Sequence, residues 1–304
     1  MLVYTFDRTL DGLLTAVFDS FALHQQPEML LGEGGVLPLF TEEVHPVVTA
    51  NDKAQRVWTG LEKQLCKEAV RMITVSWLSE ETELDTPLFH YICKVFREKR
   101  DISRNFADQD VLFVTNTARR VMHEQLRMKQ FMRFQKAKDG TYLGVVSPDH
   151  NVLPLIIDHF QDRFQDQPWL IYDAKRRYGY YYSLTPDPGL TPRSAEGRLQ
   201  GKNPSPTGER NFNGEGSIYS QEQGQVWRTG REAVVRITFE DDESLPFSLE
   251  NGKLDEAVLS ENDRLFQDLW RTYFKAICIK ERMNPKKQLS DMPRRYWRYM
   301  TEKQ

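Results

Sequence analysis

The chain has 304 residues, of which 39% are apolar and 12% aromatic, as expected for a folded protein of one large or two ordinary domains. Its formal net charge of −3 excludes a uniformly basic coat protein for nucleic acid, so any basic surface must be local. Three distant cysteines without a CxxC pair, no apolar run of ~20 residues and no basic amino-terminal leader predict a reduced, cytoplasmic protein without membrane contact.

The first 130 residues are predicted to be mainly helical behind an N-terminal strand. Residues 2–6 alternate in a β-rich pattern, and Asp7 or Thr9 can cap the helix that follows. A Gly/Pro-rich connection at 27–46 leaves room for one or two short strands. The core-facing stripe of the first helix is Leu10, Leu13, Leu14, Val17, Phe18 and Phe21.

Three further helical patterns follow in this part of the chain. One stripe runs without a break from Val57 to Ile73. A second helix opens at Thr86-Pro87, because proline suits the first turn of a helix, and a third extends from about Asp108 to Met128.

Residues 131–304 are predicted to form an antiparallel sheet followed by a C-terminal helix. One β-hairpin is expected around the turn Asp139-Gly140, and a second joins residues 169–173 to 178–182. A helix from about 151 to 164 separates them. This order predicts an α+β fold, with an antiparallel sheet of about five strands covered by helices.

The last third of the chain combines a segment of low apolar content with a strongly amphipathic one. Residues 185–230 are rich in Pro, Gly and Ser and are predicted to be a flexible insertion, followed by a strand at 233–239 and an acidic run at 240–263. An amphipathic helix then runs from Glu261 to about Lys280, and Pro285 ends it. We expect its stripe to pack inwards, through Leu265, Phe266, Leu269, Trp270, Tyr273, Phe274 and Ile277.

Sequence motifs for a bound cofactor or a known catalytic mechanism are absent. The chain has no HExxH, no GxSxG, no phosphate-binding loop and no Cys/His spacing for zinc, so neither a metal nor a cofactor is expected. Asp149 is predicted to cap the helix that follows it. The pair Asp149-His150 also allows a catalytic carboxylate and histidine.

Two basic clusters are the most distinctive features. The first contains Arg119, Arg120, Arg127, Lys129, Arg133, Lys136 and Lys138. The second, in the C-terminal tail, contains Lys280, Arg282, Lys286, Lys287, Arg294, Arg295 and Arg298 with Tyr296, Trp297 and Tyr299. Basic side chains neutralise phosphates, and neighbouring aromatic rings can stack on unpaired bases. The alternative is that these are ordinary solvated faces, with Trp297 packed on the core. The candidate nucleic-acid-binding residues are Arg127, Arg133, Lys286, Lys287, Arg294, Arg295, Tyr296, Trp297 and Arg298.

Three stretches of sequence carry a family resemblance. They are residues 4–18, residues 124–178 with Glu124-Gln125-Leu126-Arg127-Met128 and Arg176-Arg177-Tyr178, and residues 269–297 with Glu281-Arg282-Met283-Asn284 and Met292-Pro293-Arg294-Arg295-Tyr296-Trp297. Together they resemble a bacterial family of unknown function described as probable DNA metabolism or repair proteins. The resemblance covers nearly the whole chain outside the insertion, so we predict a single family module over residues 1–304.

That resemblance implies a DNA-associated role. In the family the gene commonly neighbours one for a radical-SAM protein thought to modify or repair DNA, and some members are fused to a uracil-DNA-glycosylase-like domain. DNA and a radical-SAM protein are therefore the expected partners. The family supplies no catalytic residues, and Leu126 stands where a histidine often precedes the Arg-Met pair.

We therefore expect a DNA repair or metabolism protein that binds DNA or presents it to a radical-SAM or glycosylase-type partner. One alternative is a non-enzymatic adaptor whose basic tail contacts an acidic surface of its partner. Another is an enzyme that acts on a DNA base through Asp149 and His150.

Overall fold

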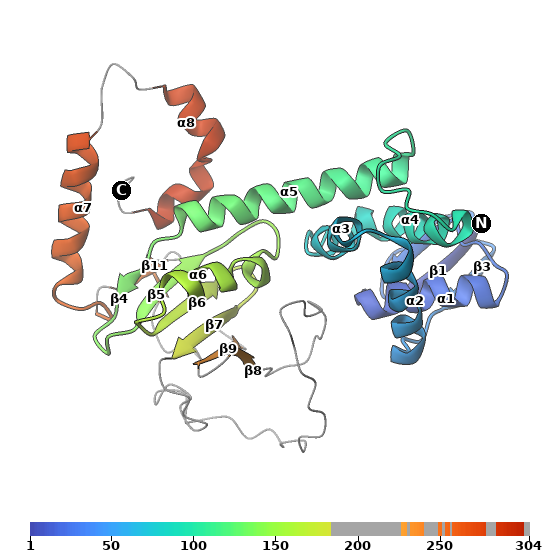
Figure 1. Ribbon diagram of the computed structural model, residues 1–304, viewed down its shortest axis with the longest axis horizontal. Coiled ribbons are helices and arrows are strands. Elements are labelled where there is room, and N and C mark those ends of the chain that lie inside the picture. The colour runs from blue at the N-terminus through green and yellow to red at the C-terminus, as the bar shows by residue number, and fades with distance from the viewer. Residues whose placement is uncertain are drawn as a thin grey trace. The chain divides into compact units, whose positions relative to one another are not determined.

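The computed structural model describes residues 1–183, 226–229, 232–239, 249–250, 253–255, 257–277 and 284–300. Most of the predicted insertion at 185–230 and half of the acidic run at 240–263 lie outside these residues. The chain divides into two compact units, and each is described by itself (Figure 1). The first unit is Met1–Glu124 with Asp149–Asn151, and the second is Gln125–Pro148 with Val152–Gln304.

The first unit contains a small parallel sheet. Strand β1 (Leu2–Phe6) is central, with β2 (Met29–Gly32) on one side and β3 (Glu43–Pro46) on the other. The predicted N-terminal strand is thus confirmed, and the Gly/Pro-rich connection supplies both of its neighbours. Val3, Tyr4 and Phe6 are fully buried, so this strand lies in the hydrophobic core of the first unit.

Helix α1 (Leu10–Ala22) follows β1 and buries its predicted stripe. The hydroxyl of Thr9 accepts a hydrogen bond from the Gly12 backbone N–H at 2.9 Å, which confirms Thr9 as the cap. Leu10, Leu13, Leu14 and Val17 are buried. Phe21 was predicted to face the core and does not: its ring is 39% exposed, because it lies in the last turn of the helix.

The stripe expected to run from Val57 to Ile73 belongs to two helices, α2 (Asn51–Gln64) and α3 (Lys67–Trp77). The single-helix prediction was wrong at Cys66. There the backbone is extended and its N–H donates to the Asp101 carboxylate at 3.1 Å, a partner 35 residues away. A long-range hydrogen bond therefore replaces the intrahelical one.

Two longer helices complete the first unit. After a short 3-10 turn (Thr82–Leu84), α4 (Asp85–Glu98) carries Pro87 in its first turn as predicted and packs against α1, α2 and β2. Helix α5 (Gln109–Phe131) begins where the Asp108 carboxylate accepts the backbone N–H groups of Asp110 and Val111. Its last residues, from Gln125, belong to the second unit.

The second unit is built on a mixed sheet, so the predicted antiparallel sheet is only partly right: one of its described strand pairs, β5 with β6, is parallel. Both predicted hairpins are present, since β4 pairs with β5 and β6 with β7 in antiparallel fashion. Strands β5 and β6 are parallel, however, because η2 (Leu153–Leu155) and α6 (Ile157–Arg163) return the chain to the same edge (Figure 1). The strands in spatial order are β4 (Gln135–Lys136), β5 (Tyr142–Val146), β6 (Trp169–Asp173), β7 (Tyr178–Ser183), β9 (Glu232–Thr238) and β8 (Val226–Thr229).

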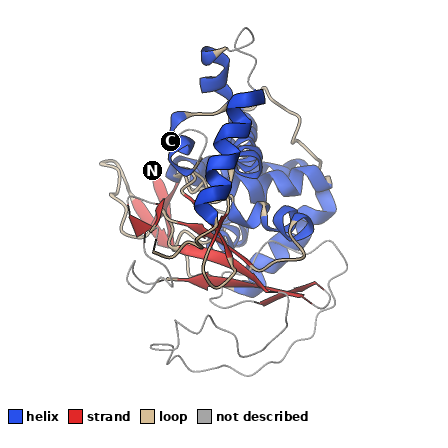
Figure 2. Cartoon of the chain, turned by 90° about the vertical axis from the view of Figure 1, so that its left-hand side faces the viewer, coloured by secondary structure: helices blue, strands red, loops and turns tan. Residues whose placement is uncertain are grey.

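Aromatic side chains fill the core of this unit. Trp169 stacks on Tyr182, their ring centroids 5.2 Å apart, and the alternation predicted for the tyrosine strand is confirmed by the burial of Tyr178 and Tyr180 beside the more exposed Tyr181. Figure 2 shows the strands in red and the helices in blue. A separate short pair, β10 (Leu249–Glu250) and β11 (Lys253–Leu254), is antiparallel.

The C-terminal segment consists of α7 (Asp263–Ile277), α8 (Pro285–Asp291) and the 3-10 helix η5 (Arg294–Tyr299). The Asn284 side chain caps α8 by accepting the Lys287 backbone N–H at 3.0 Å, so Pro285 begins a helix in addition to following one. The inward packing predicted for α7 was wrong for five residues of its stripe, and the side chains of the other two, Phe274 and Ile277, lie outside the described ones. Leu265, Phe266, Leu269, Trp270 and Tyr273 are between 41% and 63% exposed.

Candidate nucleic-acid interface

The C-terminal end of α5 lies against the tail within the second unit. The Arg127 guanidinium donates to the Ser290 carbonyl oxygen of α8 at 3.4 Å. The rings of Phe131 and Tyr296 lie 6.1 Å apart, centroid to centroid, at an interplanar angle of 39°. These contacts join a residue of the first basic cluster to the second cluster across 163 positions of sequence.

Tyr296 anchors the tail. Its side chain is 2% exposed, and its hydroxyl accepts a hydrogen bond from Arg295 Nη2 at 2.7 Å. The Arg295 guanidinium also lies 4.8 Å from the centroid of that ring. Because the ring is buried, it cannot stack on a base, and we reassign Tyr296 from base stacking to positioning of the tail.

Trp297 is partly buried, and a hydrogen bond to the backbone of the tail holds its ring. Its indole N–H donates to the Met292 carbonyl oxygen at 3.0 Å, and the Arg294 guanidinium lies 5.9 Å from the ring centroid. The packing role that the sequence favoured for Trp297 is consistent with this geometry. The exposed Arg294 is thereby held beside an aromatic surface.

The last residues of the tail reach the core of the sheet. Tyr299 packs against the apolar cluster that includes Leu143 and Val145 of β5, and burial raises the pKa of its hydroxyl. Arg298 remains exposed, with its guanidinium 4.7 Å from the Tyr299 ring centroid. The adjacent Met300 is buried. Tyr296, Tyr299 and Met300 therefore dock the tail, whereas Arg294, Arg295 and Arg298 are exposed.

The two lysines of α8 are exposed. Lys287 Nζ lies 3.2 Å from the Asp291 carboxylate in an ion pair whose side chains are both more than half exposed. Such a pair contributes little to the free energy of folding, so Lys287 can exchange Asp291 for another anion at small cost. Lys286 is exposed beside it.

Arg133 lies just beyond the end of α5. It donates from Nη1 to the carbonyl oxygens of Gln130 and Met132, at 3.0 and 3.1 Å. Its guanidinium also lies 6.0 Å from the centroid of the Trp270 ring on α7. Arg127 therefore contacts α8, and Arg133 contacts α7.

Sequence reasoning missed the contribution of α6 to this basic surface. The pKa of His159 is lowered by burial and by the positive charges of Lys129 and Arg163. The three side chains therefore share one electrostatic environment. The spacing of His159 and Arg163 at i and i+4 in a predicted helix was the available signal.

Two other arginines of the first cluster belong to the first unit. Arg120 forms an ion pair with Glu81 and also donates to the Thr117 hydroxyl at 3.0 Å. The guanidinium of Arg119 lies 5.8 Å from the Phe106 ring centroid. These contacts give both residues a structural role in that unit.

The Asp149-His150 segment is held by a buried carboxylate. Glu124, which is 1% exposed, accepts the backbone N–H groups of Asp149 and His150 at 3.0 and 2.8 Å. The Asp149 side chain is exposed, whereas that of His150 is largely covered. The predicted capping role of Asp149 was wrong, because η2 begins only at Leu153 and has no side-chain cap.

The arginine-tyrosine motif after β6 forms a turn. One oxygen of the buried Asp173 carboxylate accepts the Lys175 and Arg176 backbone N–H groups, and the other pairs with Arg176 Nη1 at 2.9 Å. Arg176 also donates to the Pro148 carbonyl oxygen at 3.1 Å. Burial raises the pKa of Asp173, although Arg176 opposes that rise. This motif is therefore structural.

Two general properties apply to the described residues alone. No three His, Cys, Asp or Glu side chains among them are grouped so that they could hold a metal ion. In the same part of the chain, none of the helices has both the length and the apolar character that crossing a bilayer requires.

A family model described as a domain of unknown function, DUF4130, matches residues 82–302. No curated protein and no solved structure matches the chain.

Proposed function

This chain belongs to the DUF4130 family of domains of unknown function, and on that premise we propose that it binds DNA and acts in DNA metabolism or repair. The DNA-binding surface consists of the end of α5, α8 and η5. In this role the protein presents DNA to a radical-SAM or glycosylase-type enzyme.

The contact between Arg127 and Ser290 carries this proposal. It places a basic residue of α5 on the same surface as the tail. Lys286, Arg294 and Arg298 are exposed there, and the guanidinium of each arginine lies beside an aromatic ring. Exposed guanidinium groups held in place by aromatic rings are suited to phosphate oxygens, which they bind in bidentate fashion.

Salt-dependent binding of the full-length protein to short DNA tests the proposal. In Arg294→Ala with Arg298→Ala, we expect weaker binding and a salt slope smaller by about 0.9 per lost phosphate contact on duplex, or about 0.7 on single strands. Arg295 is kept because it supports Tyr296. The matched control is Arg100→Ala with Arg104→Ala, which removes two exposed arginines of the first unit.

His159 provides a local readout of the same binding event. Phosphate groups near Lys129 and Arg163 would offset the positive charges that lower its pKa, so DNA should raise that pKa in an NMR titration. The proposal is wrong if DNA fails to bind at low salt. It is also wrong if the tail variant and its control lose the same affinity.

A second candidate function, a protein-interaction adaptor, is favoured by a different observation. The exposed residues Leu265, Leu269 and Tyr273 recur at intervals of four along α7, on the helix whose inward packing was expected. An amphipathic helix with anchors at this spacing can insert into an apolar groove of a partner. This adaptor would use an apolar contact, unlike the basic contact expected from the sequence.

Binding to the purified radical-SAM protein from the neighbouring gene, in nuclease-treated solution, tests the adaptor. Leu265→Gln with Leu269→Gln should abolish the interaction, whereas the control Thr272→Ala on the same helix should retain it. Equal binding by both variants would refute a role for α7. The enzyme alternative has no comparable support, because Asp149 is exposed while His150 is covered and held by Ser79 and Glu124.

A further inference from the structure

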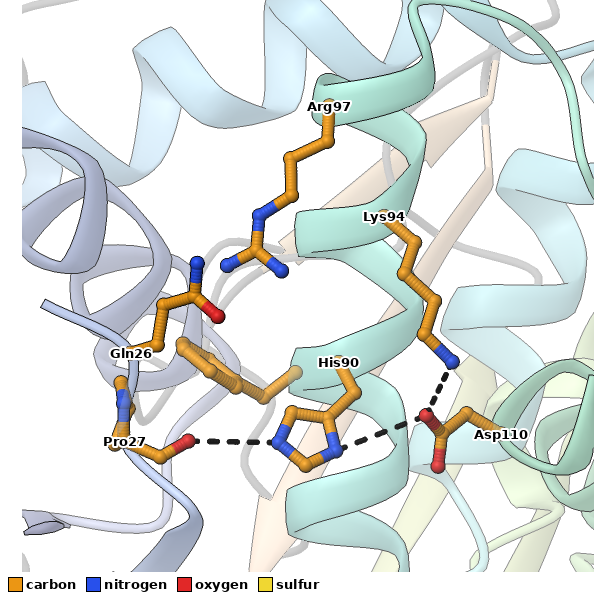
Figure 3. A pocket seen from close by; sticks show the side chains of 7 residues that line it. Gln26, Pro27, His90, Lys94, Arg97 and Asp110 are labelled. Atoms are coloured by element: carbon orange, nitrogen blue, oxygen red, sulfur yellow. Dashed lines mark hydrogen bonds and ion pairs between the residues drawn. The ribbon is translucent and has the colours of Figure 1, made fainter. Parts of the chain in front are cut away.

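A small hollow lies in the first unit, whereas the proposed DNA-binding residues all belong to the second unit. It has a volume of about 320 Å³, within the range of sites that hold small molecules. Its walls come from the loop after α1, from α4 and from the start of α5. The lining residues are Gln26, Pro27, Phe89, His90, Lys94, Arg97 and Asp110 (Figure 3).

One side of this hollow is held rigidly by its own interactions. Lys94 Nζ pairs with Asp108 at 2.6 Å and with Asp110 at 2.7 Å. Burial lowers the pKa of Lys94, but the two carboxylates raise it further, so this ammonium stays charged. The His90 ring lies between the Pro27 carbonyl oxygen at 3.5 Å and the Asp110 carboxylate at 3.7 Å. The charge of Lys94 is therefore already paired with two carboxylates, of which Asp110 lines the hollow.

The opposite side has unused hydrogen-bonding capacity. The Arg97 guanidinium and the Gln26 amide point towards one another across the hollow (Figure 3). Among the described residues, neither has a hydrogen-bond or carboxylate partner; Arg97 contacts the Phe21 ring, 5.9 Å from its centroid. That ring contact helps to hold the guanidinium on this side of the hollow.

From this asymmetry we propose that the hollow binds a small organic anion. Its carboxylate or phosphate pairs with the fork of Arg97 and with the Gln26 amide N–H, because a guanidinium matches the geometry of both groups. A hydroxyl or amine at the other end of the ligand donates to Asp110. The carbon body lies over Pro27 and Phe89, which are the apolar part of the lining.

Ligand binding to the full-length protein tests the site, with benzoate, 4-aminobenzoate and phenyl phosphate as probes and benzylamine as the cationic control. We expect millimolar or tighter binding of the anions, strongest for 4-aminobenzoate among the carboxylates, with shifts of the His90 ring resonances in NMR. Benzoate and 4-aminobenzoate differ by one hydrogen-bonding group, the amine. Phenyl phosphate distinguishes the recognition of phosphate from that of carboxylate. Benzylamine should not bind.

Variants then locate the contact. Arg97→Ala should weaken binding about tenfold or more, since it removes a charge-assisted pair, and Gln26→Ala should weaken it less. Arg100→Ala is the control, because Arg100 pairs with Glu98 and does not line the hollow. The proposal is wrong if no anion binds, if benzylamine binds equally well, or if Arg97→Ala leaves affinity unchanged. Arg97→Ala should not alter the salt slope for DNA, so this site and the DNA proposal can fail separately.

Discussion

Helices α1 and α7 carry the same kind of apolar stripe but differ in what covers it. In α1 the stripe is buried, and the helix packs against β1, α2 and α4. In α7 the described part of the stripe is exposed. Two contacts of this helix are those of Asp263, which accepts the Lys136 backbone N–H at 2.9 Å, and of Trp270, which lies beside Arg133. Helical periodicity thus identifies an apolar face but not its partner.

The largest expected effect tests this contrast directly. Leu13→Ala in α1 should lower the free energy of unfolding by about 2–5 kcal/mol, because it leaves a cavity in a closed core. The matched change Leu269→Ala in α7 should lower it by less than about 1 kcal/mol. Chemical denaturation measures both values. An equal loss in the two variants would show that the α7 stripe is covered in solution.

Two carboxylates, one buried in the first unit and one exposed in the second, extend the comparison. Asp85 at the start of α4 is buried, and burial raises its pKa to about 6 despite the Arg8 side chain at 3.2 Å. Between the unfolded value of 3.8 and about 6 the folded protein binds more protons, so this group lowers stability as pH rises through that window. The effect on the free energy of unfolding is on the order of 3 kcal/mol.

In Asp85→Asn this part of the pH dependence should disappear, while stability at pH 4 changes least. Denaturant unfolding of both proteins at pH 4 and pH 7 measures the difference. A wild-type protein whose stability does not decrease relative to the Asn variant over this interval would contradict the raised pKa.

The smallest effect is expected at the exposed counterpart on α8. Asp291→Asn removes the ion pair with Lys287, whose side chains are 60% and 72% exposed, respectively. Its effect on the free energy of unfolding should be below about 1 kcal/mol and should vanish at high salt. DNA affinity should rise slightly, because Lys287 loses a competing carboxylate. Unfolding and binding measured at two salt concentrations separate these outcomes.

Local signals in the sequence predicted much of the fold. Thr9 as a cap, Pro87 in a first turn and the Asp139-Gly140 turn each act within a few residues, and the corresponding elements are present. The wrong predictions depended on distant partners. The helical stripe is interrupted at Cys66, whose backbone N–H donates to the distant Asp101 carboxylate. The parallel pairing of β5 with β6 requires a crossover that no local pattern specifies.

The candidate site was predictable only as two separate clusters. Charge and aromatic content identified the tail, but the docking of Tyr296 against Phe131 is a tertiary contact. The pairing of Arg127 with α8 is likewise invisible in a single sequence. The hollow beside Arg97 was missed, because its lining residues come from three elements and match no motif.

The tripeptide held by Glu124 has a consequence for dividing the protein. Asp149–Asn151 belongs to the first unit although the residues on both sides belong to the second, so the backbone passes between the units after Glu124, after Pro148 and after Asn151. No single break in the gene can therefore yield two fragments that each encode one whole unit. A fragment ending at Glu124 would leave that buried carboxylate without both of its backbone donors, and a fragment beginning at residue 82 would lack the surfaces of α1, α2 and β2 that cover α4.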